Sequence, residues 1–358
     1  MKVVVTGGCG FIGSAVVRQL IADGDEVVNV DSLTYAANPA NVASVSDDPG
    51  YAFEHVDIRG YEAMRGVLAS HRPDCIMHLA AESHVDRSID GPAAFIETNI
   101  NGTHALLEAA RDYLASLDEN GRKAFRFHHV STDEVFGSLG LDDPAFNHET
   151  PYDPRSPYSA SKAASDHLVR AWGHTFAIPV VLSNCSNNYG PYQFPEKLIP
   201  LVILRALSGQ SLPVYGKGEN IRDWLHVEDH ASALIRVLKQ GRLGETYLIG
   251  GNAERRNIDV VRTICTILDD RFPDSPTVPH QNLIEYVTDR PGHDLRYAID
   301  ASRTTRELDW SPAHDFETGL AETVDWYIHN SDWWRPLTES RYDGARLGLG
   351  NDGEGAST

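Results

Sequence analysis

The first half of the chain alternates short runs of apolar, often β-branched residues with longer segments whose apolar residues recur at helical spacing. Such runs predict buried strands, and the longer periodicity predicts helices. The predicted strands span residues 2–6, 26–30, 52–56, 75–79, 126–131 and 180–184, and the helices between them span 11–22, 61–70, 93–117 and 158–176. This alternation indicates an α/β fold, a Rossmann-type doubly wound parallel sheet covered on both faces.

The pattern changes after Tyr189, because prolines and glycines punctuate residues 190–218. A helix is expected near 197–207, and a helix at 227–239 with a strand at 246–249 resumes the earlier rhythm. Further helices are expected at 257–269 and 317–328. A chain of 358 residues favours two lobes. We therefore expect a Rossmann domain over 1–190, joined by about 225–250, and a smaller C-terminal α/β substrate-binding domain over 191–335. The glycine-rich polar tail at 344–358 is expected to be disordered.

A glycine-rich loop, Thr6-Gly-Gly-Cys-Gly-Phe-Ile-Gly13, directly follows the first strand and opens the first helix. Gly7 and Gly10 permit a tight turn and close approach of a pyrophosphate, and Gly13 permits close packing of helix and strand. The helix N-terminus faces the phosphates. Asp31 ends the next strand, where a carboxylate can bind a ribose 2′-hydroxyl. The loop therefore predicts dinucleotide binding, and Asp31 without a neighbouring arginine favours NAD over NADP.

Tyr158 and Lys162 lie four residues apart, on one face of a predicted helix. Such a pair is often two surface residues, but its place in the helix after the fifth strand of a dinucleotide fold favours catalysis. A tyrosine base near neutrality needs its pKa lowered from about 10. We expect the Lys162 ammonium and a nicotinamide cation to favour the phenolate. Tyr158 would then take a hydroxyl proton while a hydride leaves the same carbon.

The segment Thr132-Asp133-Glu134 ends the fifth predicted strand, at the edge where open α/β sheets bind ligands. Helix capping is the alternative for these residue types. Neighbouring side chains of a strand point to opposite faces. Asp133 and Glu134 can therefore address one ligand only if the chain leaves the sheet here, and Gly137 fits such a turn. One carboxyl kept protonated by burial or by its neighbour's charge would provide an acid beside a base, which suits elimination of water.

The segment Trp224-Leu-His-Val-Glu-Asp-His230 places two histidines near two carboxylates. A metal site is one interpretation. The favoured interpretation is a strand end followed by a helix with an acidic first turn, which suits the helix dipole. No metal is therefore expected.

Composition narrows the partners and the compartment. The net charge of −20 disfavours nucleic acid, and no apolar run reaches the roughly 18 residues that cross a bilayer. The four cysteines show no paired spacing, which indicates reduced thiols. A cytoplasmic location is expected. The chain has six lysines, and two of them, Lys162 and Lys197, fall inside motifs.

Taken together, these residues resemble the extended short-chain dehydrogenase/reductase superfamily and, within it, the dTDP-glucose 4,6-dehydratase family. The resemblance runs from residue 1 to about 335. It is carried by the segments HVSTDEVFG, PYSASKAASDHLV, SNNYGPYQFPEKLIP, LPVYGKGENIRDWLHVEDH and DRPGHDLRYAID. The glycine loop and the Tyr158–Lys162 pair mark only the superfamily, whereas the Asp133–Glu134 doublet separates dehydratases from epimerases.

The resemblance implies a role for each catalytic residue. Tyr158 takes the proton of the sugar 4-hydroxyl as NAD accepts hydride from carbon 4. Lys162 tunes Tyr158 and holds the nicotinamide ribose, and Thr132 hydrogen-bonds the 4-oxygen. The resulting ketone acidifies carbon 5. Glu134 removes that proton and Asp133 protonates the departing 6-hydroxyl. Hydride then returns to carbon 6, which yields a 4-keto-6-deoxy sugar.

The resemblance also implies binding residues. The NAD site comprises Gly7, Gly10, Phe11, Ile12, Gly13, Asp31, Ser32, Leu33, Thr34, Asp57, Ile58, Leu79, Ala80, Ala81, Ser83, Thr98, Tyr158, Lys162 and Asn188. The nucleotide-sugar site comprises Ser83, Thr132, Asn187, Glu196, Lys197, Leu198, Pro213, Tyr215, Arg222, Asn257, Arg290 and His293. Arg222 and Arg290 can meet a diphosphate, and Tyr215 offers a stacking face.

The chain departs from the family pattern at Phe136, where tyrosine is usual, and at Asn184, where arginine is usual. The resemblance further implies a homodimer built on the helices near 93–117 and 158–176, and a place in deoxysugar or rhamnose biosynthesis. Three alternatives stay open. They are a UDP-glucose 4,6-dehydratase, a nucleotide-sugar 4-epimerase, and a non-enzymatic NAD-sensing regulator on the same fold.

Overall fold

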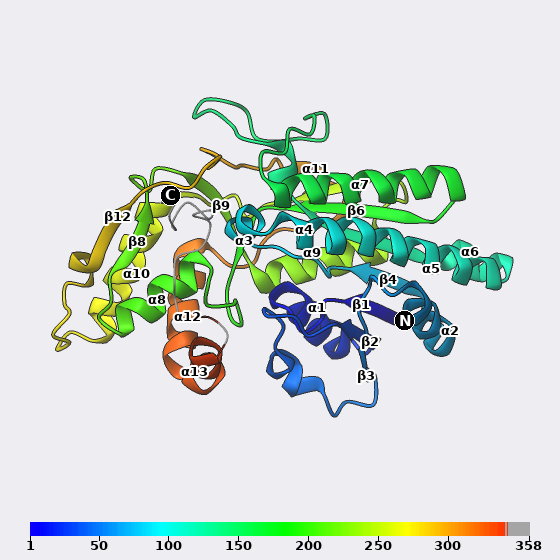
Figure 1. The fold of residues 1–358 in the computed structure, drawn as a ribbon, viewed down its shortest axis with the longest axis horizontal. Helices are drawn as coiled ribbons and strands as arrows, with labels where there is room; N and C mark the ends of the chain where they lie inside the picture. Colours follow the sequence, from blue (N-terminus) through cyan, green and yellow to red (C-terminus); the bar gives the residue numbers. More distant parts are fainter. Residues whose placement is uncertain (341, 343–358) are drawn as a thin grey trace, which may run out of the picture.

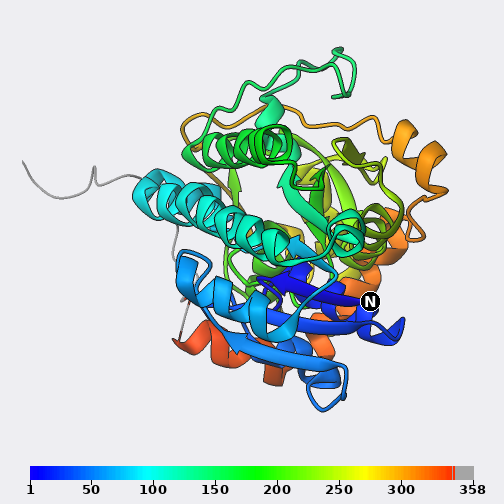
Figure 2. The same cartoon turned by 90° about the vertical axis from the view of Figure 1, so that its right-hand side faces the viewer.

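The structure is a computed structural model that describes residues 1–340 and 342 of the chain. The disordered tail expected at 344–358 lies outside these residues. No helix in this part of the chain is long and apolar enough to cross a bilayer. Figures 1 and 2 show a large sheet layered between helices, with a smaller group of elements at one end.

A parallel sheet of seven strands forms the centre of the larger lobe. Its order is β10-β6-β5-β4-β1-β2-β3. The strand order therefore reverses between β1 and β4, although the strands themselves stay parallel. The strands are β1 (Lys2–Thr6), β2 (Glu26–Asp31), β3 (Tyr51–His55), β4 (Cys75–His78), β5 (Arg126–Thr132), β6 (Val180–Cys185) and β10 (Thr246–Ile249). The six strands predicted in the first half are confirmed, with ends within one residue of the prediction. The doubly wound α/β fold is confirmed as well.

Helices cover both faces of this sheet, and the strands are apolar on both sides for that reason. Val3 and Val5 pack toward α1 (Phe11–Ala22) and α9 (Val227–Gln240), whereas Val4 packs toward the opposite face. That opposite face is covered by α2 (Tyr61–His71), α5 (Thr103–Ser116) and α7 (Pro157–Phe176). In Figures 1 and 2, α5 and α7 lie side by side, and Trp172 donates a hydrogen bond of 2.7 Å to Glu108 between them.

The prediction of one continuous α-helix over residues 93–117 is wrong, because a π-helical segment interrupts it. The structure has α4 (Pro92–Phe95), a wider π-helical segment η2 (Ile96–Gly102) and then α5. Within the wide turn, the Asn99 side chain accepts a hydrogen bond from the backbone of Glu82 at 2.8 Å and donates one to it at 3.0 Å. The π-helical turn thus joins this helix to the loop after β4. Such turns are often found at functional sites.

The smaller lobe has its own apolar core at the far end of the molecule from the N-terminus (Figure 1). It contains a sheet of β7 (Asn187–Tyr189), β9 (Ile221–His226) and β11 (Glu254–Arg256), and a pair of β8 (Leu212–Tyr215) with β12 (Ile284–Val287). Its helices include α8 (Leu198–Leu207), α10 (Asn257–Arg271), α12 (Phe316–His329) and α13 (Ser331–Ser340). Shorter helices elsewhere are α3 (Val85–Asp90), α6 (Glu119–Ala124) and α11 (Ser302–Leu308). The predicted helices of this half are confirmed, whereas its small strands were not predicted.

The histidine segment follows the favoured interpretation. Strand β9 ends at His226, and α9 begins at Val227 with Glu228 and Asp229 in its first turn. The His230 ring forms a hydrogen bond of 2.8 Å with the side chain of Asn188. Within residues 1–340 and 342, no cluster of three or more potential ligands could hold a metal ion.

Candidate active site

Two cavities adjoin at the carboxyl ends of the parallel strands, where ligands bind in open α/β sheets. The larger, of about 410 Å³, follows the ends of β1, β2, β4, β5 and β6. The second, of about 380 Å³, lies between the loop after β4 and the smaller lobe. Both are lined by Ser83, Glu134, Asn187, Glu196 and Lys197. Two ligands, one in each cavity, could therefore contact each other at this junction.

The glycine loop forms one wall of the larger cavity. Gly7 adopts φ +74°, and a Cβ there would lie 2.9 Å from the backbone of Ala80. A Cβ on Gly13 would lie 2.1 Å from the carbonyl oxygen of Gly7. Any larger residue at either position would displace the backbone. The loop therefore brings the N-terminus of α1 up to the cavity, as binding of a pyrophosphate requires.

Asp31 lies at the end of β2 on the same cavity wall. Its carboxylate accepts backbone hydrogen bonds from Cys9 at 2.9 Å and from Leu33 at 2.8 Å. Burial raises the pKa of Asp31, and these two hydrogen bonds oppose the shift. The residue is thus a fixed acceptor at the place where a dinucleotide ribose would lie.

Most of the residues implied for the NAD site line this cavity: Gly7, Gly10, Phe11, Ile12, Gly13, Asp31, Ser32, Thr34, Asp57, Ile58, Leu79, Ala80, Ala81, Ser83, Thr98, Tyr158, Lys162 and Asn188. Leu33 is the exception. Its side chain packs against the apolar core beside α1, so only its backbone is placed near Asp31. The glycine cradle, the acceptor at Asp31 and the cavity volume together fit a dinucleotide.

The acidic doublet leaves the sheet as the sequence required. Thr132 ends β5, and η3 (Asp133–Phe136) begins immediately after it as a 3₁₀ turn. The Thr132 hydroxyl accepts a hydrogen bond of 3.3 Å from the backbone of Glu134, and Gly137 ends the turn at φ +86°. The turn brings both carboxyl groups to the larger cavity, and Glu134 reaches the second cavity as well.

The two carboxyl groups have different environments. Burial raises the pKa of Asp133 well above its ordinary value, and the charges of Glu134 and Asp223 raise it further. Burial also raises the pKa of Glu134, but the charges of Arg290, Arg222 and Lys197 oppose that shift. Asp133 is therefore the better proton donor and Glu134 the better acceptor.

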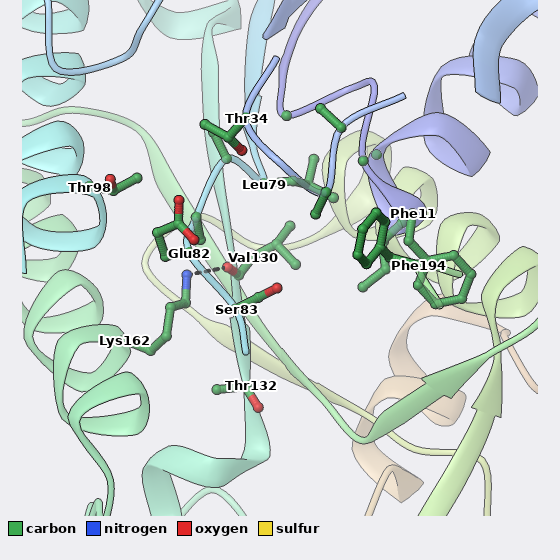
Figure 3. A pocket seen from close by; sticks show the side chains of 18 of the residues that line it. Phe11, Thr34, Leu79, Glu82, Ser83, Thr98, Val130, Thr132, Lys162 and Phe194 are labelled. Carbon is green, nitrogen blue, oxygen red and sulfur yellow. Dashed lines mark hydrogen bonds between the residues drawn. The ribbon is translucent and has the colours of Figure 1, made fainter. Parts of the chain in front are cut away.

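Helix α7 presents Tyr158 and Lys162 to the cavity. Ser156 and Ser159 form a capping box around Pro157, which fixes the start of the helix just before Tyr158. Figure 3 shows Lys162 with Glu82 and Thr98 on one side of the cavity, opposite Phe11 and Phe194. The Lys162 ammonium donates a hydrogen bond of 2.9 Å to the Val130 carbonyl.

In the protein alone, the surroundings of Tyr158 favour its neutral form. Burial, followed by the charge of Glu134, raises the pKa of Tyr158 well above its ordinary value, although a hydrogen bond with Thr132 opposes the shift. The Lys162 ammonium is oriented toward the Val130 carbonyl. The expected effect of a nicotinamide cation on the pKa of Tyr158 applies only to the protein with its cofactor bound.

The second cavity gathers most of the implied nucleotide-sugar residues: Ser83, Asn187, Glu196, Lys197, Leu198, Pro213, Tyr215, Arg222, Asn257, Arg290 and His293. Thr132 lines the larger cavity instead, beside Tyr158. Asp86, in the first turn of α3, was missed by the sequence analysis. It accepts hydrogen bonds from Tyr215 at 2.9 Å and from Arg290 at 3.0 Å. Its partners lie 129 and 204 residues away, so local spacing carried no signal for it.

Comparison with known proteins agrees with this geometry. A family model described as GDP-mannose 4,6 dehydratase matches residues 4–323. A dTDP-glucose 4,6-dehydratase of Escherichia coli is 58% identical over 98% of this chain and 99% of its own length. A Bacillus anthracis dTDP-glucose 4,6-dehydratase solved in complex with NAD has a TM-score of 0.83 and 45% identity, covering 94% of this chain and 99% of that chain. A double mutant of DesIV, the dTDP-glucose 4,6-dehydratase of Streptomyces venezuelae, solved with NAD and DAU bound, has a TM-score of 0.86 and 45% identity, covering 94% and 100%. From these matches and the paired cavities, the chain belongs to the nucleotide-sugar 4,6-dehydratase family of the short-chain dehydrogenase/reductase superfamily.

Proposed function

We propose that the chain is an NAD-dependent lyase that converts dTDP-glucose to dTDP-4-keto-6-deoxyglucose and water. One observation carries the proposal. Asp133 and Glu134 have pKa values shifted to different extents and lie with Tyr158 around one cavity that adjoins a second, arginine-bearing cavity. The similar proteins of known name support dTDP-glucose as substrate and NAD as cofactor. An epimerase would not need this acid–base pair.

NAD, when bound, would supply the hydride acceptor for carbon 4 and the hydride donor for carbon 6, and the glycine loop and Asp31 of the larger cavity would hold it. Tyr158 takes the proton of the 4-hydroxyl, while Thr132 hydrogen-bonds the same oxygen. Once carbon 4 is a ketone, the proton on carbon 5 is acidic enough for Glu134 to remove. Asp133 gives its proton to the departing 6-hydroxyl, which leaves as water. When carbon 6 is reduced, Glu134 returns a proton to carbon 5. Tyr158 then releases the proton that it took and Asp133 regains one, so no net oxidation remains.

The nucleotide part of the substrate is assigned to the second cavity. Arg222 and Arg290 supply positive charge for the diphosphate, and Tyr215 supplies an aromatic face. Arg222 is 4% exposed and lies over the Tyr297 ring at 4.2 Å, so its guanidinium is held in place. The sugar would then lie at the junction, between Glu134 and Lys197.

Further assignments follow from the family. Residues 1–190, with about 225–250, form the NAD-binding domain, and 191–335 form the nucleotide-sugar domain. The chain acts as a homodimer through α5 and α7, where Phe176 is 42% exposed, and the neighbouring Ile96 is 45% exposed. The enzyme works in the cytoplasm and supplies deoxysugar or rhamnose biosynthesis. Size-exclusion chromatography with light scattering tests the dimer, and a monomer at micromolar concentration contradicts it.

Turnover of dTDP-glucose in heavy water tests the central proposal. Mass spectrometry and NMR should find a product that has lost one water and carries solvent deuterium at carbon 5. Unchanged mass with an inverted carbon 4 would identify an epimerase. Preference for UDP-glucose would identify the other dehydratase class, and no turnover of any nucleotide sugar would favour the regulator.

A further inference from the structure

Asp166 is a buried carboxylate that the reaction described above does not use. It lies on α7, one helical turn beyond Lys162, and is 0% exposed. One oxygen accepts hydrogen bonds from the Ser131 hydroxyl at 2.9 Å and the Tyr152 hydroxyl at 2.8 Å. The other oxygen lies 3.1 Å from Nε2 of His129. These donors surround the carboxylate within the protein interior.

The same carboxylate connects α7 to the end of β5, which the acidic doublet directly follows. His129 and Ser131 belong to β5, which ends at Thr132. The Asn184 amide, on β6, lies 3.4 Å from Asp166 and donates a hydrogen bond of 2.9 Å to the backbone carbonyl of Thr132. Asp166 thus holds the helix that carries Tyr158 against the strand that ends just before Asp133.

The surroundings favour an ionised Asp166. Burial by itself raises the pKa of a carboxyl, but here the nearby ring Nε2 of His129, the charge of Lys162 and the Ser131 hydroxyl together lower the pKa of Asp166 below its ordinary value. Burial and the charge of Lys162 lower the pKa of His129 to about 4, so His129 is neutral near pH 7. Lys162 is therefore the cation that balances Asp166. A buried charge is costly unless it serves such a pairing.

Lys162 needs that balance. Burial lowers the pKa of Lys162, whereas the charge of Asp166 opposes the shift, followed by Cys185 on β6. The other titratable groups that interact with Lys162 are His129 on β5 and His78 on β4, and burial lowers the pKa of both histidines. Neither histidine supplies negative charge. Asp166 is the carboxylate on the same helix that does.

We propose that Asp166 is a positioning residue whose buried negative charge keeps Lys162 protonated and whose hydrogen bonds set α7 against the ends of β5 and β6. This inference rests on the proposed function and on the role that the resemblance implies for Lys162, which is to hold the nicotinamide ribose and tune Tyr158. The asparagine variant separates charge from shape, since it keeps the size and one acceptor of the side chain.

The first experiment compares the pH dependence of kcat in Asp166→Asn and Tyr152→Phe. Asp166→Asn removes the charge, so the alkaline limb should move to lower pH by about one pH unit, because Lys162 loses its proton earlier. Tyr152→Phe removes one hydrogen bond and keeps the charge, so its alkaline limb should stay at the wild-type position. An unmoved limb in Asp166→Asn, or an equal shift in Tyr152→Phe, overturns the inference.

The second experiment measures Lys162 directly and needs no turnover. The chain has six lysines, so ¹³Cε-lysine NMR gives few signals, and loss of one signal in Lys162→Met assigns it. The wild-type signal should report a charged ammonium at about pH 8, and Asp166→Asn should lower the titration midpoint. A neutral wild-type amine at that pH overturns the inference even if Asp166→Asn does not fold. Failure to turn over dTDP-glucose would contradict the proposed function alone, because this titration does not depend on catalysis.

Discussion

The carboxylate of Glu196 lies 2.8 Å from the guanidinium of Arg87, and its other oxygen accepts a hydrogen bond of 2.9 Å from Tyr35. The Arg87 guanidinium also lies 3.9 Å from the centre of the Tyr35 ring. Glu196 lines both cavities, whereas Arg87 and Tyr35 come from α3 and from the loop after β2. The resemblance implies sugar binding for Glu196. The structure shows that it also joins separate segments at the junction of the cavities.

Arg87→Ala should therefore lower stability and weaken substrate binding together. Removing one partner of a buried pair costs about 3 to 5 kcal/mol. Because 29% of the Arg87 side chain is exposed and the Glu196 side chain is 1% exposed, we expect a loss of about 2 kcal/mol in the free energy of unfolding. Urea unfolding measures this loss, and the KM for dTDP-glucose should rise.

The control for this change is Lys123→Ala. The Lys123–Glu119 pair lies on α6 with side chains 72% and 76% exposed, so its loss should cost about 0.5 kcal/mol or less. Equal stability of the two variants would show that the buried carboxylate is satisfied without Arg87.

Glu134→Gln should separate the first hydride transfer from elimination. Glutamine keeps the size of the side chain but cannot take the proton from carbon 5, so product formation should fall about 10²- to 10⁴-fold. The near-ultraviolet absorbance of reduced nicotinamide should still rise in a single turnover, because Tyr158 and Thr132 are intact. Dehydration at the wild-type rate would exclude Glu134 as the base.

Asp133→Asn should stabilise the protein at neutral pH while it impairs catalysis. Burial, with the charge of Glu134, raises the pKa of Asp133 in the folded state. A group with a raised folded pKa contributes its full stability only below its unfolded pKa, and that contribution is lost as the pH rises. By pH 7 the wild type has lost part of this contribution, so the neutral asparagine should gain about 1 kcal/mol, a usual size for such a site.

Thermal unfolding over a range of pH measures this difference. The gain should shrink as the pH falls toward about 3, where the carboxyl is protonated in both states. A gain of equal size at both ends of the range would show that the effect comes from packing and not from ionisation.

The sequence predicted the large sheet well because strands buried on both faces are continuous apolar runs, as Val3, Val4 and Val5 illustrate. It did not predict β8 and β12, which pair Leu212 with Ile284, because each strand has only four residues and the pairing is far apart in sequence. The π-helical turn at 96–102 was missed because Ile96 and Ile100 keep the four-residue spacing that is also typical of an α-helix.

The candidate site divides in the same way. Residues in local motifs, such as Gly7 and Tyr158, could be placed by their distance from a strand end. Asp86 and Arg87 could not, since their roles depend on partners more than 100 residues away in the chain. Nor could spacing show that the Lys162 ammonium donates a hydrogen bond to the backbone carbonyl of Val130 on β5.

Asp31→Asn should weaken NAD binding and reduce discrimination against NADP. The wild-type carboxylate is fixed by the backbone of Cys9 and Leu33, so it can accept from ribose hydroxyls and repel a 2′-phosphate. Losing one charged acceptor should weaken NAD about 10-fold. The ratio of the dissociation constants for NADP and NAD should fall, as calorimetry on cofactor-free protein can measure. Glu54→Gln is the matched control, since Glu54 pairs with Val30 across β2 and β3 but binds His71 outside the cavity. An unchanged ratio in Asp31→Asn, or the same fall in Glu54→Gln, would show that Asp31 does not select the cofactor.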